Sequence, residues 1–381
     1  MININLLIIF VQGVMLFILR FLRIISEDKY YTRIAEMIKS NGVVFVKLAQ
    51  ISSSRNDNGG LPEPLTVKLR NIQDKCFYYL SGTVRQLPGL TYLNANPISA
   101  GSICNIYLVT YRGRPAVLKS AHENIQTYID DSIKTLRQVN FLYRLYSGHD
   151  IENNINLTGY REYICQQLDL SREASYQGRM RDIFRPHRQI RIPEVYLSGA
   201  DYIVMEQIEG LKYNDFIALY PERTMECISL IYSVVYTMIR SGCIHGDLHF
   251  GNFSYYTGPT GNVHMNILDY GIMMEVTKVQ LAYLQGGFNI MEDDKTCSRS
   301  FLNFVSTFDP LLKARLSKID LNKGDYTYDE LMGIMNNVAI PLPFVAFFTT
   351  IQSFYTLIRG KSKAELTDII CYMIENDFLE F

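Results

Sequence analysis

Two short polar motifs in the second half of the chain contain residue types that suit phosphoryl transfer. In the first, Asp247 is followed five residues later by Asn252; in the second, Asp269 opens an Asp-Tyr-Gly turn after the apolar segment 263–268. In phosphoryl-transfer sites one aspartate faces the acceptor hydroxyl, whereas an asparagine and a second aspartate hold magnesium on the phosphates. The order and spacing therefore predict that Asp247 orients the nucleophile and that Asn252 and Asp269 bind Mg²⁺.

The first motif has an alternative interpretation as a metal-binding run. His245, Asp247 and His249 alternate with other residues, and imidazole together with carboxylate groups suits zinc or iron. No further cluster of histidine and cysteine in the sequence completes such a centre, so a metallohydrolase is the less favoured interpretation. Within a phosphoryl-transfer loop, His245 is expected to orient the backbone rather than to transfer protons.

The composition excludes some classes of partner. The chain of 381 residues, enough for one large bilobal domain or two ordinary ones, carries 37 lysines and arginines against 38 aspartates and glutamates. Because the net charge is close to zero, no overall field attracts nucleic acid, and we predict that the chain binds none. The seven cysteines are scattered, without a C-x-x-C pair, which indicates reduced thiols in an intracellular compartment.

Residues 1–25 form an apolar N-terminal segment and a possible membrane anchor. No charged side chain occurs before Arg20, which Arg23 and Lys29 follow. About 20 apolar residues cross a bilayer, so the segment is just long enough, and the basic residues after it would leave the following domain in the cytosol. The alternative is an apolar helix that lies in the membrane interface or packs on the protein itself. A cleaved signal peptide is disfavoured because the basic residues follow the apolar run.

Two features of the first half suit the binding of phosphates. Ala100, Gly101 and Ser102 are small residues in a predicted turn, where backbone N–H groups can approach an anion closely. The alternating segment 114–119 predicts a strand that ends in Lys119, and an ammonium group at that point can bridge two phosphates of a nucleotide. Together with the magnesium motifs, these features predict ATP and Mg²⁺ as cofactors.

Helical patterns surround these strands. Apolar residues recur at helical spacing over 26–40, and 125–146 and 160–184 are predicted to be two further helical stretches. Segment 211–240 should contain two helices, and its apolar residues are spaced for burial on one side. The buried residues that this spacing predicts are Ile228, Ile231, Val235 and Ile239.

Three segments resemble the UbiB-like (ADCK) atypical kinase family, over about residues 40–280. Lys47-Leu48-Ala49-Gln50 is similar to the family's Lys-x-Gly-Gln signature, residues 97–107 resemble its Ala-rich phosphate loop, and Gln167–Ala174 resembles its Glu-Leu-Asp-Phe-Arg-Arg-Glu-Ala helix. Two departures are Ala49 for the family glycine and Gln167 for the first family glutamate. In the family that glutamate anchors the signature lysine, so the neutral Gln167 loses the charge-assisted part of the contact.

The resemblance implies roles for further residues. Glu173 matches the helix glutamate that would pair with Lys119 and hold it on the nucleotide. Lys47 and Gln50 would fold over the nucleotide, on the side where ordinary protein kinases bind their substrate.

The resemblance also implies the fold and its division. We expect an α+β, bilobal protein-kinase-like fold with an N-terminal helical extension, in which backbone groups of Glu206 and Ile208 bind adenine. The expected parts are an apolar segment 1–25, a helical extension 26–90, an N-lobe 91–208 and a mainly helical C-lobe 209–381.

The expected function is that of an intracellular, ATP- and Mg²⁺-dependent UbiB-like kinase or ATPase, which residues 1–25 would hold at a membrane. The family implies a link to isoprenoid-lipid metabolism or a protein substrate. A small-molecule phosphotransferase of the aminoglycoside or choline type is an alternative, because it shares the H-G-D-L-H-x-G-N loop, although it lacks counterparts of segments 47–74 and 167–174. A nucleotide-binding scaffold with weak catalysis is a second alternative.

Overall fold

The computed structural model describes most of the chain, in several ranges. These are residues 4–40, 44–45, 62–70, 85–101, 103–147, 157–287, 294–308 and 361–378, with the single residues 347, 354 and 357. The chain divides into two compact units. The first unit comprises Met1–Ala174 and Glu194–Gln207, and the second comprises Ser175–Pro193 and Ile208–Phe381.

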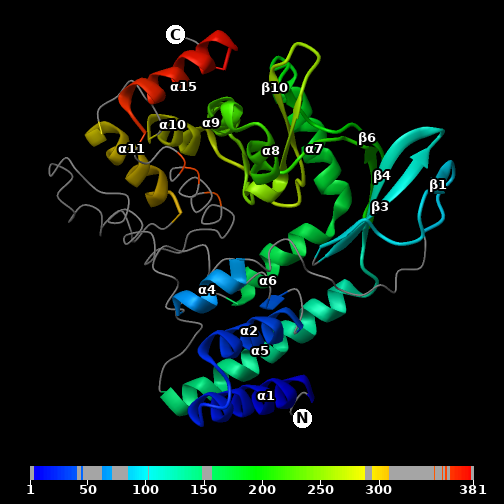
Figure 1. The fold of residues 1–381 in the computed structure, drawn as a ribbon, viewed down its shortest axis with the longest axis vertical. Helices are drawn as coiled ribbons and strands as arrows, with labels where there is room; N and C mark the ends of the chain where they lie inside the picture. Colours follow the sequence, from blue (N-terminus) through cyan, green and yellow to red (C-terminus); the bar gives the residue numbers. More distant parts are fainter. Residues whose placement is uncertain are drawn as a thin grey trace. The chain divides into compact units, whose positions relative to one another are not determined.

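The first unit is built on an antiparallel sheet (Figure 1). Its strands follow the order β1-β3-β4-β7-β6, and β2 pairs with β3 beside this path. The bounds are β1 Leu90–Tyr92, β2 Ser99–Ala100, β3 Cys104–Tyr111, β4 Arg114–Ala121, β6 Val195–Gly199 and β7 Tyr202–Glu206. The β3–β4 connection is a two-residue turn, Arg112-Gly113, with positive φ at both residues, which matches the twist of the strands that it joins. The predicted strand 114–119 therefore lies within β4.

The two faces of this sheet differ in how they are covered. One face carries a closed apolar cluster that includes Tyr107, Val109, Leu118 and Val204. Residue Lys119 is one position along from Leu118, so its side chain lies on the opposite face. The apolar cluster therefore covers one face of the sheet, and Lys119 projects from the other.

The helices of the first unit include the N-terminal extension. Their bounds are α1 Ile4–Phe21, α2 Glu27–Ser40, α4 Glu63–Arg70, α5 Ile125–Ser147 and α6 Leu157–Cys165, followed by a 3₁₀ turn at Gln166–Leu168. The helices predicted over 26–40 and 125–146 are confirmed within one or two residues. Helix α2 packs against α4 through a small core that includes Ala35, Leu65 and Leu69. Among the described helices, none has both the length and the apolar character needed to cross a bilayer.

One predicted helical stretch is interrupted. Instead of a continuous helix over 160–184, the structure has α6, the 3₁₀ turn and then α7 Leu170–Phe184. Asp169 separates them with an extended backbone, and its carboxylate accepts from the backbone N–H groups of Ser171 at 3.1 Å and Arg172 at 3.3 Å. These contacts lower the pKa of Asp169, with the hydroxyl of Ser171 as the first cause. The prediction of a continuous helix was wrong, because an aspartate is more favourable as the N-cap of a helix than in a helix interior.

The second unit packs helices and short strands around α9. Its helices are α8 Tyr213–Leu219, α9 Thr224–Ser241, α10 Lys278–Gly287, α11 Asp294–Ser306 and α15 Lys363–Glu375. Its strands are β5 Ile190–Arg191, β8 Cys243–His245, β9 Phe253–Thr257, β10 Val263–Ile267 and β11 Met273–Glu275. The predicted burial of Ile228, Ile231, Val235 and Ile239 on α9 is confirmed. Gly242 ends the helix with φ +69°, a left-handed conformation that glycine adopts without steric cost.

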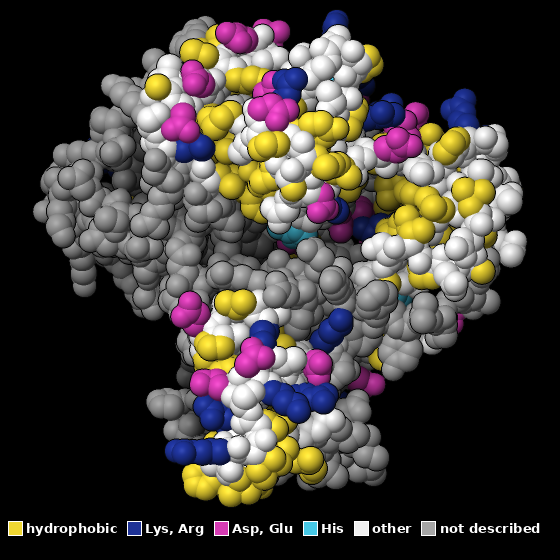
Figure 2. Space-filling model, in the orientation of Figure 1, with side chains coloured by type: hydrophobic (Ala, Val, Ile, Leu, Met, Phe, Trp, Pro, Cys, Tyr) yellow, Lys and Arg dark blue, Asp and Glu magenta, His cyan; other side chains and the backbone are white. Residues whose placement is uncertain are grey.

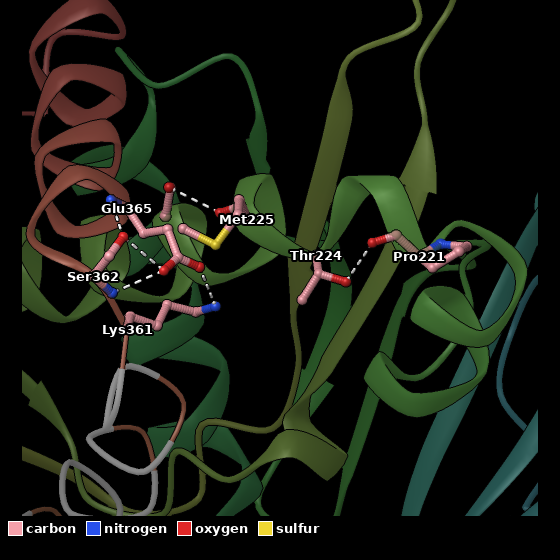
Figure 3. A network of polar contacts seen from close by, with 7 residues as sticks. Pro221, Thr224, Met225, Lys361, Ser362 and Glu365 are labelled. Carbon is pink, nitrogen blue, oxygen red and sulfur yellow. Dashed lines mark hydrogen bonds and ion pairs between the residues drawn. The ribbon is translucent and has the colours of Figure 1, made fainter.

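The last helix begins with a complete capping box beside α9 (Figure 3). The Ser362 hydroxyl accepts from the Glu365 N–H, and the Glu365 carboxylate accepts from the Ser362 N–H at 2.8 Å. Lys361 adds an ion pair to the same carboxylate at 3.0 Å. The pKa of Glu365 is lowered to about 2, chiefly by the Ser362 N–H. These contacts fix the start of α15, which packs on α9.

Candidate active site

A β-hairpin brings Asn252 and Asp269 together in the second unit. Strands β9 and β10 pair antiparallel with Phe253 opposite Ile267. One residue further, the N–H of Leu268 donates to the carbonyl of Asn252 at 2.8 Å. The residue after Leu268 is Asp269, so the hairpin register itself places the predicted magnesium ligands at one end of the strands.

The side chain of Asn252 closes the loop that begins at Asp247. Its amide nitrogen donates to the Asp247 backbone carbonyl at 2.7 Å, and its backbone N–H donates to the His249 carbonyl at 2.8 Å. Because the amide nitrogen is engaged, the carboxamide oxygen is the atom that can act as a metal ligand. The spacing of five residues thus allows the side chain of Asn252 to close the loop onto the backbone of Asp247.

Asp269 adopts a left-handed backbone conformation. Its φ is +60°, which is uncommon outside glycine and best tolerated by asparagine and aspartate. The carboxylate accepts from the Gly271 N–H at 3.1 Å, a local contact that helps to hold this conformation. Sparsely populated backbone conformations concentrate at functional sites, where the surrounding structure fixes them.

A buried imidazole joins the two motifs. The Nδ1 atom of His245 accepts from the N–H of Asp247 at 3.1 Å, and its Nε2 contacts the backbone carbonyl of Asp269. A carbonyl only accepts, so Nε2 carries the proton and the ring is neutral. Burial lowers the pKa of His245, against the opposing charges of Asp247 and Asp269. His245 therefore orients both acidic residues through the backbone.

These contacts disfavour the alternative metal centre. Both ring nitrogens of His245 are engaged, and Nδ1 of His249 accepts from the Gly251 N–H at 3.0 Å. In the described ranges of the chain, no group of three or more histidine, cysteine, aspartate and glutamate side chains is placed to hold a metal. The oxygen donors of Asn252 and Asp269 instead fit Mg²⁺, which takes one or two protein oxygens and completes its shell with phosphates and water.

In the first unit, Lys119 and Glu173 form a bidentate ion pair. The Lys119 ammonium lies 2.7 Å and 2.9 Å from the two carboxylate oxygens of Glu173. The side chains are only 11% and 3% exposed. Lys119 comes from β4, between Ile106 of β3 and Ile203 of β7, and Glu173 lies in the first turn of α7. The structure thus joins two of the predicted residues that are far apart in sequence.

Two contacts fix the start of α7, just before this glutamate. Asp169 caps the helix, and the N–H of Leu170 donates to the Ala200 carbonyl at 2.8 Å, in the turn between β6 and β7. Gln167, at the position of the family's first glutamate, is buried and donates to the Tyr163 carbonyl at 3.3 Å. Its predicted partner Lys47, like Gln50, lies outside the described residues.

The predicted phosphate turn follows β2. Ala100 pairs with Asn105 of β3, and the Gly101 N–H donates to the Cys104 carbonyl at 2.8 Å; Ser102 lies outside the described residues. A methyl group added at Gly101 would meet only the Cys104 carbonyl, at 3.5 Å. The glycine is therefore not required by space, which agrees with the alanine that the resembling family carries there.

Sequence reasoning missed the apolar residues that flank Lys119 on the sheet. Ile106, Leu108, Val117 and Met205 share its face by register and are partly exposed, whereas their neighbours on the opposite face are buried. A partly exposed apolar surface beside a lysine that is predicted to contact phosphate suits the flat face of a base. Counting alternate positions back from Lys119 would have identified Val117.

The predicted adenine contacts fall where the chain passes between units, since Glu206 belongs to the first and Ile208 to the second. The Glu206 N–H donates to the Glu194 carbonyl at 2.8 Å, and its carboxylate accepts from the Glu194 N–H at 3.3 Å. Both adenine contacts stay predictions.

Comparison with known proteins decides the family. The model of the ABC1 atypical kinase-like domain matches residues 89–301, more than half of the chain. The chain belongs to the ABC1 atypical kinase-like family. The matched region contains both the Lys119–Glu173 pair and the Asp247–Asp269 loop, but not Lys47 or Gln50.

Curated relatives of this ABC1-family chain carry the name "Probable protein kinase UbiB". Proteins from Shewanella baltica (strain OS185) and Shewanella woodyi are each 26% identical, over 269 and 278 residues, which is 65% and 67% of the chain. The chain spans about half the length of these relatives, 48% and 50%. A solved Mycobacterium tuberculosis complex, Rv3197 with erythromycin, is 19% identical, with a TM-score of 0.40 over 70% of this chain and 77% of that one. The UbiB-like assignment and the α+β, bilobal protein-kinase-like class are confirmed.

Proposed function

We propose that this ABC1-family chain is an ATP- and Mg²⁺-dependent phosphotransferase or ATPase. The observation that supports this most directly is the neutral His245, which ties Asp247 and Asp269 into one rigid group with Asn252. Family membership gives the kinase-like context, and the donor chemistry of the loop fits magnesium.

Each residue has a separate task in this proposal. Magnesium and the nucleotide would supply charge neutralisation and the transferable γ-phosphoryl group. Asn252 and Asp269 would hold the metal through oxygen atoms, and Asp247 would orient the attacking hydroxyl or water. Lys119, held by Glu173, would contact the phosphates with an ammonium group. In such sites the protein contributes position and electrostatics rather than covalent chemistry of its own.

The acceptor is proposed only as a class. The resemblance to UbiB-like proteins supports an isoprenoid-lipid or protein acceptor, and water as acceptor makes the same site an ATPase. A small-molecule phosphotransferase shares the catalytic loop but is not supported by the match to the ABC1 domain. A binding scaffold is the second candidate. The amide of Gln167 donates to the backbone carbonyl of Tyr163, and its neutral side chain cannot anchor a lysine by charge.

The decisive experiment combines nucleotide binding and turnover on the whole chain. We expect MgATP to raise the melting temperature of the wild type, and Asp269→Asn to abolish that shift. Asparagine tolerates the positive φ of residue 269, so the variant should fold. Asp215→Asn is the matched control, since it removes one exposed carboxylate from the same unit, on α8. An Asp269→Asn variant that keeps the full shift would contradict the magnesium role.

Turnover then separates the two candidates. Phosphate release or transfer by the wild type supports the enzyme, and we expect Asp247→Asn to reduce it while MgATP binding persists. Binding of MgATP by the wild type without turnover, in the presence or absence of lipid vesicles, would favour the scaffold.

A further inference from the structure

Helix α1 presents a continuous apolar face to solvent. From residue 11 on, its large exposed side chains recur at helical spacing and include the two phenylalanines of the last turns, Phe17 at 63% and Phe21 at 76% exposure. Figure 2 shows hydrophobic side chains gathered over this helix at the bottom of the view, with lysine and arginine side chains beside them. The exposed face consists of Val11, Val14, Met15, Phe17, Ile18 and Phe21.

From residue 11 on, the opposite side of α1 packs against other helices of the first unit. Leu16 and Leu19 are half-buried, and the helix packs on α2 and α5. Helix α2 carries exposed charges, among them Glu27 and Asp28. Moving α1 across a bilayer would carry these groups into hydrocarbon, at a cost of a few kcal/mol each. At 18 residues, or about 27 Å, α1 is also slightly shorter than the hydrocarbon core of about 30 Å.

The charges near α1 favour a negatively charged surface. No acidic residue precedes Glu27 in the sequence, and Glu27 itself pairs with Arg20 at 3.2 Å. Arg23 and Lys29 are exposed at the same end of the helix. An apolar face with basic residues at its border is the arrangement of helices that sit between the headgroups and acyl chains of anionic membranes.

We propose that α1 is an interfacial membrane-binding helix. It lies parallel to an anionic bilayer, inserts the face that contains Phe17 and Phe21 among the acyl chains, and places Arg23 and Lys29 at the lipid phosphates. The partner is the lipid surface itself, because the apolar face matches the acyl chains and the cations at its border match the anionic headgroups. This mode keeps the rest of the first unit outside the bilayer and is independent of nucleotide binding.

Vesicle sedimentation of the whole chain tests the proposal. We expect binding to vesicles of phosphatidylcholine that contain about 30% anionic phosphatidylglycerol, and weaker binding to vesicles of phosphatidylcholine alone. Phe17→Glu with Phe21→Glu should reduce the binding constant about tenfold or more, because two buried phenyl groups are lost. Arg23→Glu should reduce only the dependence on phosphatidylglycerol.

The control is Leu219→Glu, which changes an equally exposed leucine, at 65%, on α8 of the second unit. Failure of the wild type to bind either vesicle, or an equal loss in Leu219→Glu, would overturn the proposal. So would a concentration-dependent dimer in sedimentation velocity that Phe17→Glu with Phe21→Glu abolishes without any vesicle binding, because the face would then cover a second copy.

A second inference concerns His122 and rests on the proposed function. Three residues after Lys119, the His122 N–H donates to the Ile103 carbonyl at 2.9 Å, and its Nε2 lies 3.0 Å from the Gly101 carbonyl. A carbonyl accepts only, so Nε2 is the donor. His122, which directly follows the strand that carries Lys119, thus holds Gly101 and Ile103 of the predicted phosphate turn. We infer that His122 is a positioning residue that holds this turn in its nucleotide-binding shape.

Kinetics on the whole chain test this role. His122→Ala should raise the KM for MgATP about two- to tenfold, the worth of one hydrogen bond, with kcat unchanged. His122→Gln, which can still donate, should restore KM, and His264→Ala, a half-buried histidine of β10 in the second unit, should leave it unaltered. Turnover with an unchanged KM in His122→Ala would overturn this inference alone, whereas a wild type that binds no nucleotide would overturn the proposed function with it.

Discussion

Variants of the ion pair between Lys119 and Glu173 should change stability and nucleotide turnover in different ways. Two contacts of 2.7 Å and 2.9 Å between side chains that are 11% and 3% exposed correspond to about 6 kcal/mol of Coulomb attraction at an effective dielectric constant of about 20. Much of this offsets the desolvation of the two groups. Removing one partner leaves the other buried without its opposite charge, so we expect Lys119→Met or Glu173→Gln to cost about 3 kcal/mol of unfolding free energy.

The double variant Lys119→Met with Glu173→Leu should behave differently. Because neither charge is left buried, it should regain most of the stability that each single variant loses. It should nevertheless have no nucleotide turnover, since the ammonium group is absent. Urea unfolding followed by circular dichroism measures the first property, and phosphate release measures the second.

The matched control is the exposed pair of Asp182 and Arg185 on α7 and just after it. Asp182→Asn should cost less than about 1 kcal/mol, because solvent screens this pair. A double variant that is no more stable than the single ones would refute the electrostatic reasoning. A double variant that keeps turnover would refute the assignment of Lys119 to the phosphates.

Two further predictions concern the elements that hold the site. The pKa of His245 is lowered by burial, so below pH 6.5 the unfolded chain binds a proton that the folded chain does not. Stability should therefore fall as the pH drops from 6.5 towards the folded pKa, and His245→Gln should flatten part of that fall in urea titrations at several pH values; an unchanged slope would contradict the neutral ring. Asp169→Ala should lose about 1 kcal/mol through the cap of α7, while Asp169→Asn keeps it, and equal losses in both variants would show that charge rather than capping matters.

Local patterns were sufficient for the elements that depend on neighbouring residues. The helix over 26–40, the strand that contains Lys119 and the buried positions of α9 follow from spacing. The spacing from Asp247 to Asn252 corresponds to a loop that one side-chain hydrogen bond closes. The helix predicted over 160–184 was wrong because its apolar periodicity continues through Asp169, where capping prevails. Whether Asp169 caps a helix or continues one depends on its backbone conformation, and the spacing of apolar residues carries no information about that conformation.

The sequence by itself determined the chemical groups and their order along the chain, because residue type and local spacing decide which atoms can bind magnesium or phosphate. Spacing did not decide which of them meet: the family resemblance implied the pairing of Lys119 with Glu173, and only the tertiary structure shows the contact. Lys119 and Glu173 are 54 residues apart, and their contact depends on a strand and a helix being packed together. Likewise, His245 was predicted to orient the loop backbone, but its partners were not. It becomes the neutral link between Asp247 and Asp269 because folding buries its ring, and burial removes both its charge and its access to solvent.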